Sequence, residues 1–180
     1  IYFARTQTIL TKEGLDPVVA MEIFPGRAGI LCGINEVLDL LRQVAPDAEV
    51  DTLDEGATMS AKEIVLRIRA RYSAFGLYET AILGMLAHQS GWATAAREIV
   101  DVAAPIPVIS FGARHVHPDV AARLEYAAIV GGCITCATSA GARLAGKQPT
   151  GTIPHAMVLI FGDTLRATEA FDKWMPREIN

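Results

Sequence analysis

Apolar and polar positions alternate most regularly between residues 64 and 71. The even positions carry Ile64, Leu66, Ile68 and Ala70, and the odd positions carry Val65, Arg67, Arg69 and Arg71. Side chains with a period of two point to opposite faces of an extended chain. The pattern predicts a half-buried strand with a basic outer face. Upstream, the apolar run 18–24 ends at Pro25-Gly26, which predicts a buried strand followed by a turn.

Two other segments show helical spacing. Asn35 precedes a predicted helix over 36–44, with its apolar side formed by Val37, Leu38, Leu40 and Leu41. A second helix is predicted over 78–89, where Ala81, Ile82, Met85 and Leu86 recur at helical intervals and Gly91 marks the expected end. Strands and helices mixed in this order predict an N-terminal α+β domain over residues 1–104.

The rhythm changes after residue 104. An apolar strand over 107–111 is broken by Gly112, and Pro118 opens a helix whose inner face would be Val120, Leu124 and Ala128. After Gly131-Gly132 we expect a strand over 133–137, a helix over 139–145 and an apolar helix over 157–161. Repeated strand–helix units are typical of parallel α/β folds. We therefore predict that residues 105–180 form the first strand–helix units of an α/β barrel.

A closed barrel of this kind usually needs ~250 residues. The barrel interpretation therefore predicts that the natural protein continues beyond Asn180; the alternative is a smaller open sheet. The chain begins Ile1-Tyr2-Phe3 without an initiator methionine or an apolar signal segment. We expect that it starts a few residues into the natural protein.

Composition narrows the possible classes of protein. The chain has 180 residues, 51% hydrophobic and 20% charged, with a net charge of −4. This charge provides no electrostatic basis for binding nucleic acid, and no apolar run has the length of a membrane span. The three cysteines, without a secretion signal, favour the reducing cytoplasm. Cys133 and Cys136 have zinc-motif spacing but no second pair, so we interpret them as buried thiols.

Candidate chemistry falls where predicted strands end, which is where sites gather in parallel α/β folds. At the first junction, Phe111 is suited to stack on a flat ring and Arg114 to pair with a carboxylate or phosphate. The alternative is an ordinary turn with a surface arginine. Gly131-Gly132 is a second junction, where missing Cβ atoms would let a ligand approach the backbone, or simply a helix end.

The third junction is Gly151-Thr152-Ile153-Pro154-His155. We expect Thr152 to cap a helix that holds Pro154 in its first turn, with His155 just after it. A phosphoryl group on His155 would then face free backbone N–H groups and the positive helix end. The alternative is a histidine that only caps or packs. Elsewhere, His115 and His117 supply at most two metal ligands.

Several short segments, in this order, resemble motifs of the nicotinate phosphoribosyltransferase family, which has the type II phosphoribosyltransferase fold. The similarity is closest to its compact archaeal and bacterial branch. It rests on Tyr2-Phe3-Ala4-Arg5-Thr6, on residues 72–80 (YSAFGLYET), on Phe111-Gly112-Ala113-Arg114, on Gly131-Gly132 and on Gly151-Thr152-Ile153-Pro154-His155.

The resemblance implies that nicotinate displaces pyrophosphate from phosphoribosyl pyrophosphate and yields nicotinate mononucleotide for NAD biosynthesis. It further implies that ATP phosphorylates His155 and that hydrolysis of the phosphohistidine drives the reaction. Mg²⁺ would neutralise the leaving pyrophosphate.

The resemblance also implies roles for individual residues. In a cytoplasmic homodimer with shared active sites, Tyr2 of a second subunit and Phe111 would sandwich the pyridine ring. Arg114 would bind the anionic groups of the substrate. The resemblance further implies that Gly132 and Thr152 contact the substrate, and that Arg71 and His115 bind anionic groups. It implies no residue as a metal ligand.

Two other functions fit parts of the sequence. Quinolinate phosphoribosyltransferase shares the fold, uses no ATP and releases CO₂, and its substrate with two carboxylates needs a denser basic pocket, which Arg67, Arg69 and Arg71 could supply. The second is a non-catalytic paralogue that binds a nucleotide. Related nicotinamide enzymes place an aspartate after the glycine pair, whereas this chain has Cys133-Ile134-Thr135 there. That difference favours an acid over an amide as substrate.

Overall fold

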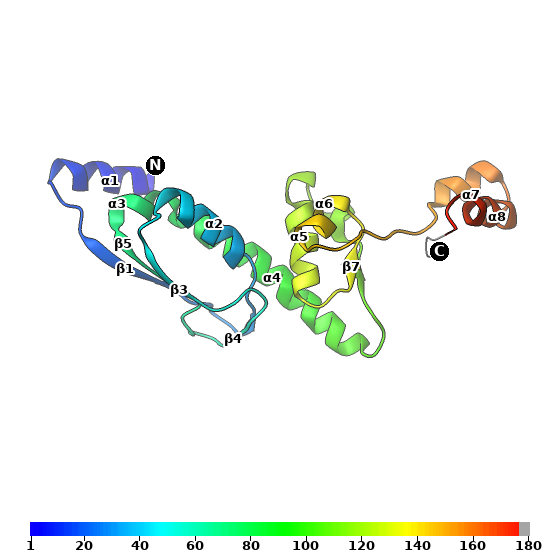
Figure 1. Cartoon of the computed structure of the whole chain (residues 1–180), viewed down its shortest axis with the longest axis horizontal. Helices are drawn as coiled ribbons and strands as arrows, with labels where there is room; N and C mark the ends of the chain where they lie inside the picture. The colour runs from blue at the N-terminus through cyan, green and yellow to red at the C-terminus, as the bar shows by residue number, and fades with distance from the viewer. Residues whose placement is uncertain (177–180) are drawn as a thin grey trace.

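The computed structural model describes residues 1–176 as an elongated molecule with a small sheet near one end and a helical hairpin at the other (Figure 1). The first part contains α1 (Tyr2–Lys12), β1 (Val18–Ile23), β2 (Gly29–Ile30), α2 (Ile34–Val44), β3 (Glu49–Thr52), β4 (Thr58–Met59), β5 (Leu66–Arg71), α3 (Tyr72–Phe75) and η1 (Gly76–Tyr78). The second contains α4 (Glu79–Ala103), β6 (Ile109–Ser110), η2 (Gly112–His115), α5 (Pro118–Val130), β7 (Thr135–Cys136), α6 (Ser139–Leu144), α7 (His155–Phe161) and α8 (Thr164–Trp174).

The N-terminal sheet is antiparallel, in the order β1-β5-β3. The predicted alternation is confirmed along β5, because Leu66 and Ile68 are fully buried while Arg69 is exposed. It is wrong for the two residues before the strand, since Ile64 is exposed and Val65 is buried. β1 occupies the predicted position but is not a buried strand, since its residues alternate between exposed and half-buried. Among residues 1–176, β1 pairs with β5 alone, and an antiparallel sheet can keep one of its faces in water.

The main core lies between this sheet and helices α2 and α4. It contains Val37 and Leu41 of α2, Ile68 of β5, and Ile82 and Leu86 of α4. Each of these side chains gains roughly 1.5–3 kcal/mol when it is fully buried. The spacing of apolar residues in α2 therefore accounts for its position on the sheet.

Helix α4 connects the two parts of the molecule. The prediction that it would end near Gly91 is wrong, because the helix continues to Ala103. Beyond the glycine, Ala93 packs with Ala127 of α5, and Ala96 packs with Ala128. A glycine inside a helix costs about 1 kcal/mol relative to alanine. Packing of the second half of α4 against α5 outweighs that cost.

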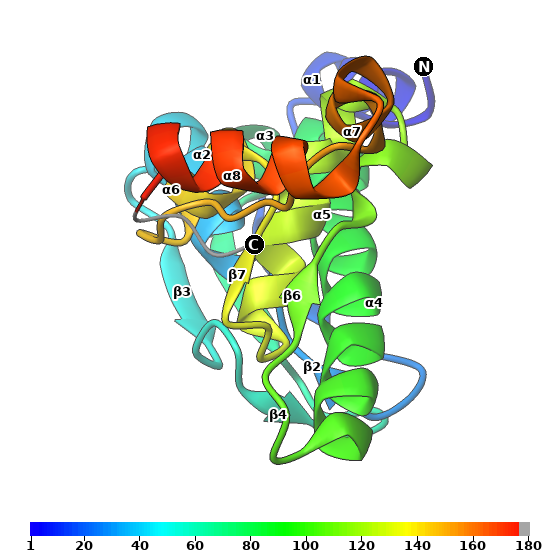
Figure 2. The same ribbon diagram turned by 90° about the vertical axis from the view of Figure 1, so that its right-hand side faces the viewer.

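β6 and β7 are parallel and are joined through η2 and α5, with Ile109 opposite Thr135 and Ser110 opposite Cys136. Figure 2 shows the two strands side by side next to α4 and α5. This is a strand–helix–strand unit, as predicted. The expected fold class, an α+β part followed by parallel strand–helix units, is confirmed.

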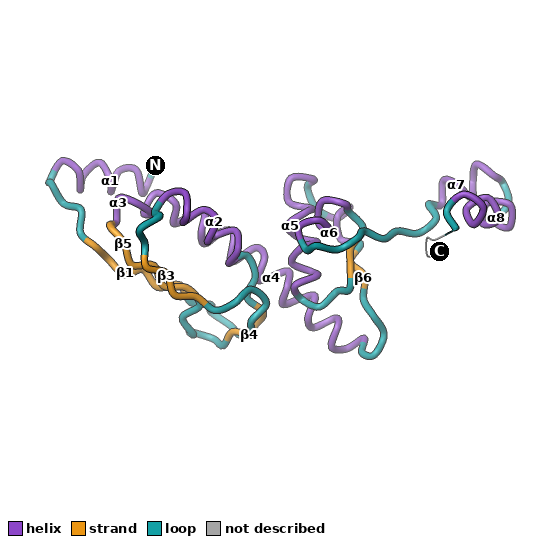
Figure 3. The backbone as a smooth tube through the Cα atoms, viewed as in Figure 1, coloured by secondary structure: helices purple, strands orange, loops and turns teal. Residues whose placement is uncertain are grey.

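An extended segment follows α6 and leads to α7 and α8, which lie apart from the other elements (Figure 3). Asp163 begins α8 by accepting a hydrogen bond from Arg166 N at 2.8 Å. The last four residues of the predicted second domain, 177–180, lie outside the described residues. Between residues 1 and 176, no helix combines the length and apolar character that a membrane span requires.

Candidate active site at the ends of two parallel strands

The carboxyl ends of β6 and β7 are held together beyond the strands themselves. Ala137 N donates a hydrogen bond to Ser110 O at 3.0 Å, so the two chains leave the sheet side by side. Phe111 follows directly on one of them. The next residue, Gly112, lies so close to α5 that an added Cβ would come within 2.8 Å of Leu124 Cδ2. The glycine therefore allows the chain to turn tightly against the helix.

The turn presents an aromatic ring and a cation to solvent. Phe111 is 45% exposed, and Arg114 and His115 in η2 are also exposed. Among residues 1–176, Arg114 forms no ion pair. An unpaired guanidinium beside an exposed ring suits a flat anion. His117 has a structural use instead, since its Nδ1 accepts a hydrogen bond from Asp119 N and caps α5.

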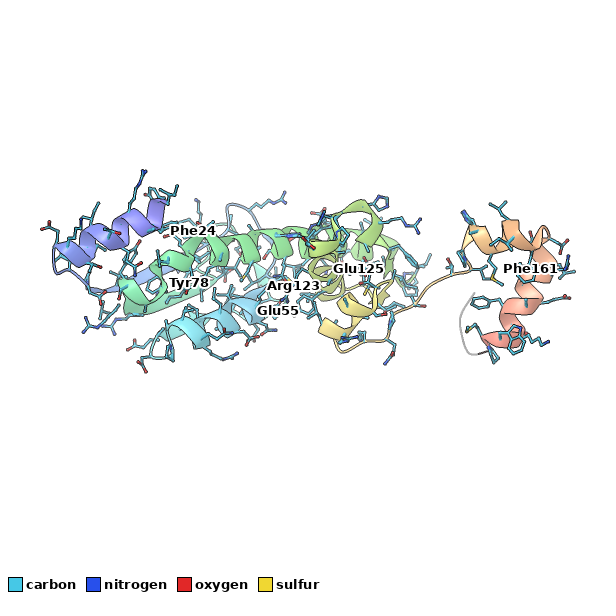
Figure 4. All side chains as sticks on the ribbon, turned by 90° about the horizontal axis from the view of Figure 1, so that it is seen from above. Phe24, Glu55, Tyr78, Arg123, Glu125 and Phe161 are labelled. Atoms are coloured by element: carbon cyan, nitrogen blue, oxygen red, sulfur yellow. The ribbon has the colours of Figure 1, made fainter. Side chains whose placement is uncertain are left out.

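A buried carboxylate supports the other strand end. Glu125 of α5 is fully buried, and its Oε2 accepts hydrogen bonds from Thr138 N at 2.8 Å and Thr138 Oγ1 at 2.5 Å. Thr138 Oγ1 in turn accepts from Gly141 N at 3.1 Å and caps α6. Figure 4 places Glu125 in the middle of this part of the molecule. The turn after β7 therefore has a fixed shape.

The pattern of the sequence did not single out Glu125. The available signal was a carboxylate directly beside Leu124, within a helix whose buried positions are otherwise apolar. A fully buried glutamate is rare unless it has partners. Its partners come from β7 and α6, which the sequence could not place against it.

The three cysteines are buried and free, which confirms the prediction of buried thiols. Burial, with a contribution from the nearby Glu125 carboxylate, raises the pKa of Cys136 to about 12. Burial also raises the pKa of Cys133. These thiols are protonated near neutral pH and are poor nucleophiles and poor metal ligands.

The segment that contains His155 is attached to the end of β7. Thr150 N donates to Cys136 O at 3.0 Å, and Thr135 Oγ1 donates to Gln148 O. Five residues later His155 begins α7, exposed to solvent. The predicted capping by Thr152 is wrong: Pro154 occupies the N-cap position in extended conformation, with no side-chain capping bond. Proline has no N–H and a fixed φ, so it suits the start of a helix.

Three predicted site residues lie away from these strand ends. Tyr2 is 76% exposed on α1, and Figure 1 shows the N-terminus and α7 in opposite halves of the molecule. Arg71, at the end of β5, donates to Asp16 O at 3.0 Å. Gly132 has φ +115° and precedes β7, so it lies at the amino end of the strand; an added Cβ there would approach Arg97 Nη2 to 3.0 Å. Within one chain, the strand ends therefore bring together Phe111, Arg114 and His115. His155 lies at the start of α7, which stands apart from these elements at the end of an extended segment (Figure 3).

The arginines of β5 are engaged in pairs. Arg67 lies 2.8 Å from Glu22 Oε1, and Arg69 lies 3.2 Å from Glu49 Oε1. Arg71 lies 3.9 Å from Asp16 Oδ2. Neighbouring carboxylates therefore balance the basic face that the sequence predicts.

The chain is similar to one protein family and to several individual proteins. The family model described as "Quinolinate phosphoribosyl transferase, N-terminal domain" matches residues 1–90. A nicotinate phosphoribosyltransferase of Mycobacterium tuberculosis, pncB2, is 29% identical over 143 residues, which cover 79% of this chain and 31% of that protein. A second, pncB1, is 27% identical over 133 residues, covering 74% and 30%.

Among solved structures, the chain is similar to the nicotinate-nucleotide pyrophosphorylase from Pyrococcus furiosus, with a TM-score of 0.89 and 39% identity over 95% of this chain and 45% of that one. It shares the fold of human nicotinic acid phosphoribosyltransferase, with a TM-score of 0.73 and 19% identity over 88% and 40% of the two chains. The chain spans less than half the length of each of these relatives.

Proposed function

The chain belongs to the family of the quinolinate phosphoribosyl transferase N-terminal domain, and on that premise we propose that the protein is a nicotinate phosphoribosyltransferase coupled to ATP. The pyridine nitrogen of nicotinate would attack C1 of the ribose in phosphoribosyl pyrophosphate. The C1–O bond would break, and pyrophosphate would leave with its electron pair. The product would be nicotinate mononucleotide, in the biosynthesis of NAD.

One observation carries the proposal. Exposed Phe111 and unpaired Arg114 follow β6, and the segment that leads to His155 is bonded to the adjacent end of β7 through Thr150 N. A ring-binding face and an anion-binding group would thus lie at the end of β6, and the segment that leads to His155 in α7 begins at the adjacent end of β7. Parallel α/β enzymes place their sites at these ends. In this proposal, ATP phosphorylates His155, and water later cleaves the phosphohistidine to phosphate.

Tyr2 takes part only if a second subunit supplies it. Tyr2 is highly exposed on α1, which Figure 3 shows in the opposite half of the molecule from β6. We assign it to the site of the partner in a homodimer, where it would cover the other side of the pyridine ring. Co-expression of chains carrying Tyr2→Ala with chains carrying His155→Ala tests this assignment. Mixed dimers should regain activity that neither variant has alone; no recovery would place both residues of one site in one chain.

We assign Mg²⁺ to the phosphate oxygens of the substrates. Residues 1–176 contain no group of three or more His, Cys, Asp or Glu side chains that could hold a metal ion. A hard cation with phosphate ligands needs few protein ligands. No chemical step is therefore assigned to a protein-bound metal.

Quinolinate is the second candidate substrate, favoured by the family description and by the name of the Pyrococcus furiosus relative. The ion pairs of Arg67, Arg69 and Arg71 argue against it, since these side chains already face carboxylates. A substrate with two carboxylates would need further unpaired cations.

Product formation by the natural gene product separates the two substrates. Nicotinate mononucleotide formed from nicotinate, and increased several-fold by ATP, is the expected result. Formation of nicotinate mononucleotide from quinolinate, with release of one CO₂ and no response to ATP, would overturn the assignment of nicotinate as the substrate.

A further inference from the structure

An apolar cleft lies in the N-terminal part of the molecule, between helix α4 and the segment that joins β1 to β2. It has a volume of about 340 Å³. Buried Leu31, Met59 and Leu86 line it, together with Phe24 and Leu83, which are 49% and 42% exposed. Figure 4 shows Phe24 beside α4. Small-molecule sites have volumes of roughly 300–1,000 Å³ and mostly apolar linings, so the cleft has the size and lining of such a site.

A glycine of α4 keeps one side of this cleft open. Ala87, Gly91 and Thr94 follow one another at intervals of four and three residues and all line the cleft, so they share one face of the helix. An added Cβ at Gly91 would meet no atom within 4 Å. Alanine would therefore fit there and would favour the helix. Packing does not require this glycine, and its effect is to leave free space on the face that borders the cleft.

The hydroxyl groups on the α4 wall of the cleft bond to the protein itself. Ser90 Oγ accepts a hydrogen bond from Cys32 N at 3.0 Å and donates one to Cys32 O at 3.1 Å. Thr94 Oγ1 accepts from Ile30 N at 2.9 Å. Both hydroxyls thus hold β2 and the residues after it against α4. An apolar ligand body is favoured along this wall, because a polar one would exchange its hydrogen bonds to water for contacts with carbon.

A single cation accompanies this apolar lining. Arg27 carries the one charge among the lining residues, is exposed, and forms no ion pair with any residue between 1 and 176. Lys62 adds positive potential beside it, since its Nζ lies 4.9 Å from the centre of the Phe24 ring. The acidic neighbours along the chain are engaged: Glu22 pairs with an arginine of β5, and Glu63 accepts from a backbone N–H. The charge of Arg27 therefore favours an anion.

We propose that this cleft binds a small carboxylic acid in its anionic form, with the carboxylate on Arg27 and an apolar body against α4. One guanidinium balances one negative charge and matches the two oxygens of a carboxylate, whereas a phosphate dianion would need further cations. The site is independent of the proposed phosphoribosyl transfer, because none of its lining residues belongs to the strand ends after β6 and β7.

Three molecules that share one aliphatic body test the site: octanoate, octanamide and octylamine. None contains an aromatic ring, so none resembles nicotinate. Binding to the natural gene product is measured by NMR, from shifts of the Met59 and Leu86 methyl signals. Octanoate should bind at least about fivefold more tightly than octanamide, the effect of one charge-assisted pair in a half-open cleft, and octylamine should bind most weakly. Equal binding of all three would overturn the proposal. So would the absence of shifts with octanoate, which is the result expected if a second subunit closes the cleft.

A pair of glycine variants in α4 locates the apolar body of the ligand. Gly91→Leu fills the free space of the cleft and should abolish the shifts that octanoate causes. Gly84→Leu is the matched control, because Gly84 lies in the same helix, is exposed, and has open space beside it outside the cleft. Octanoate should shift the same signals in this control as in the unmodified protein. Octanoate binding that survives Gly91→Leu would contradict the proposal.

A pair of arginine variants locates the carboxylate. Arg27→Gln keeps a side chain of similar length without the charge and should reduce octanoate binding to the level of octanamide. Arg166→Gln, at an exposed position of α8, should leave the preference for octanoate unchanged. If Gly91→Leu does not fold, Arg27→Gln decides alone, since a preference for octanoate that persists in Arg27→Gln would place the carboxylate elsewhere and contradict the proposal.

Discussion

The basic residues of β5 and of the turn after β6 occupy two different environments. Arg67 and Arg69 lie on one face of the sheet. Arg67 forms an ion pair with Glu22 Oε1 at 2.8 Å, and Arg69 forms one with Glu49 Oε1 at 3.2 Å. Arg114 follows a strand end, is exposed, and forms no ion pair within residues 1–176. Pairing with a carboxylate therefore distinguishes an arginine that supports the fold from one that is available to a ligand.

The largest expected effect is a loss of stability when the buried carboxylate of Glu125, which lies under the turn after β7, is removed. Glu125→Ala removes the acceptor of Thr138 N and Thr138 Oγ1 and leaves a cavity under the turn. The free energy of unfolding of the natural gene product should fall by about 3 kcal/mol. Chemical denaturation measures it. Glu169→Ala, at an exposed position of α8, is the control and should change it by less than about 0.5 kcal/mol. A loss below 1 kcal/mol for Glu125→Ala would show that the turn does not depend on the carboxylate.

The next effect contrasts the two kinds of arginine directly. Arg114→Met should lower kcat/KM for nicotinate roughly 30-fold, since a charge-assisted hydrogen bond contributes about 2 kcal/mol. Arg69→Met should change it less than about twofold, because Arg69 is paired on the sheet. Steady-state kinetics with varied nicotinate measures both. Equal losses in the two variants would remove the distinction between paired and unpaired arginines.

A smaller effect is expected on the pH dependence of stability, through the buried thiol of Cys136. The pKa of Cys136 is raised from 9.0 to about 12, so folding favours the protonated thiol. Its contribution to stability is complete below pH 9 and is lost as the pH rises towards 12, by up to about 1 kcal/mol per pH unit. Denaturation at pH 8, 9 and 10 should show a decline that is weaker in Cys136→Ala. Parallel declines of stability in the two proteins would contradict the raised pKa of Cys136 in the folded state.

The smallest expected effect is the loss of stability when an ion pair on the face of β5 is removed. Arg69 and Glu49 have side chains that are 57% and 72% exposed, and exposed pairs contribute between zero and about 1 kcal/mol. Arg69→Met should therefore lower the free energy of unfolding by less than 1 kcal/mol, and added salt should reduce the difference further. A loss above 2 kcal/mol would mean that the basic face of β5 supports the fold more strongly than surface pairing allows.

Much of the fold was predictable because local patterns and packing agree. The period of two along β5 and the apolar faces of α2 and α5 specify those elements, and Gly131-Gly132 ends α5 as expected. Gly91 misled the prediction because the packing of Ala93 and Ala96 on α5 is a contact between segments distant in sequence. No local pattern contains that information.

The positions of the candidate site along the chain were easier to predict than its three-dimensional construction. Phe111 and Arg114 were identified because glycine and arginine follow an apolar strand, and the structure places both at the strand end. The capping assignment of Thr152 failed because Pro154 already provides an extended N-cap. The pairing of Arg71 with Asp16, and the burial of Glu125 and Gln89, depend on tertiary contacts that spacing does not reveal.

The proposed function depends most on the transfer of a phosphoryl group from ATP to His155. Intact-protein mass spectrometry of the natural gene product after incubation with Mg-ATP measures this directly, with His155→Ala and, as a control on α4, His88→Ala beside it. We expect one acid-labile phosphoryl group on the unmodified protein and on His88→Ala, and none on His155→Ala. Absence of the group from the unmodified protein, or its persistence in His155→Ala, would contradict ATP coupling through His155 and favour the quinolinate reaction or a non-catalytic nucleotide-binding protein.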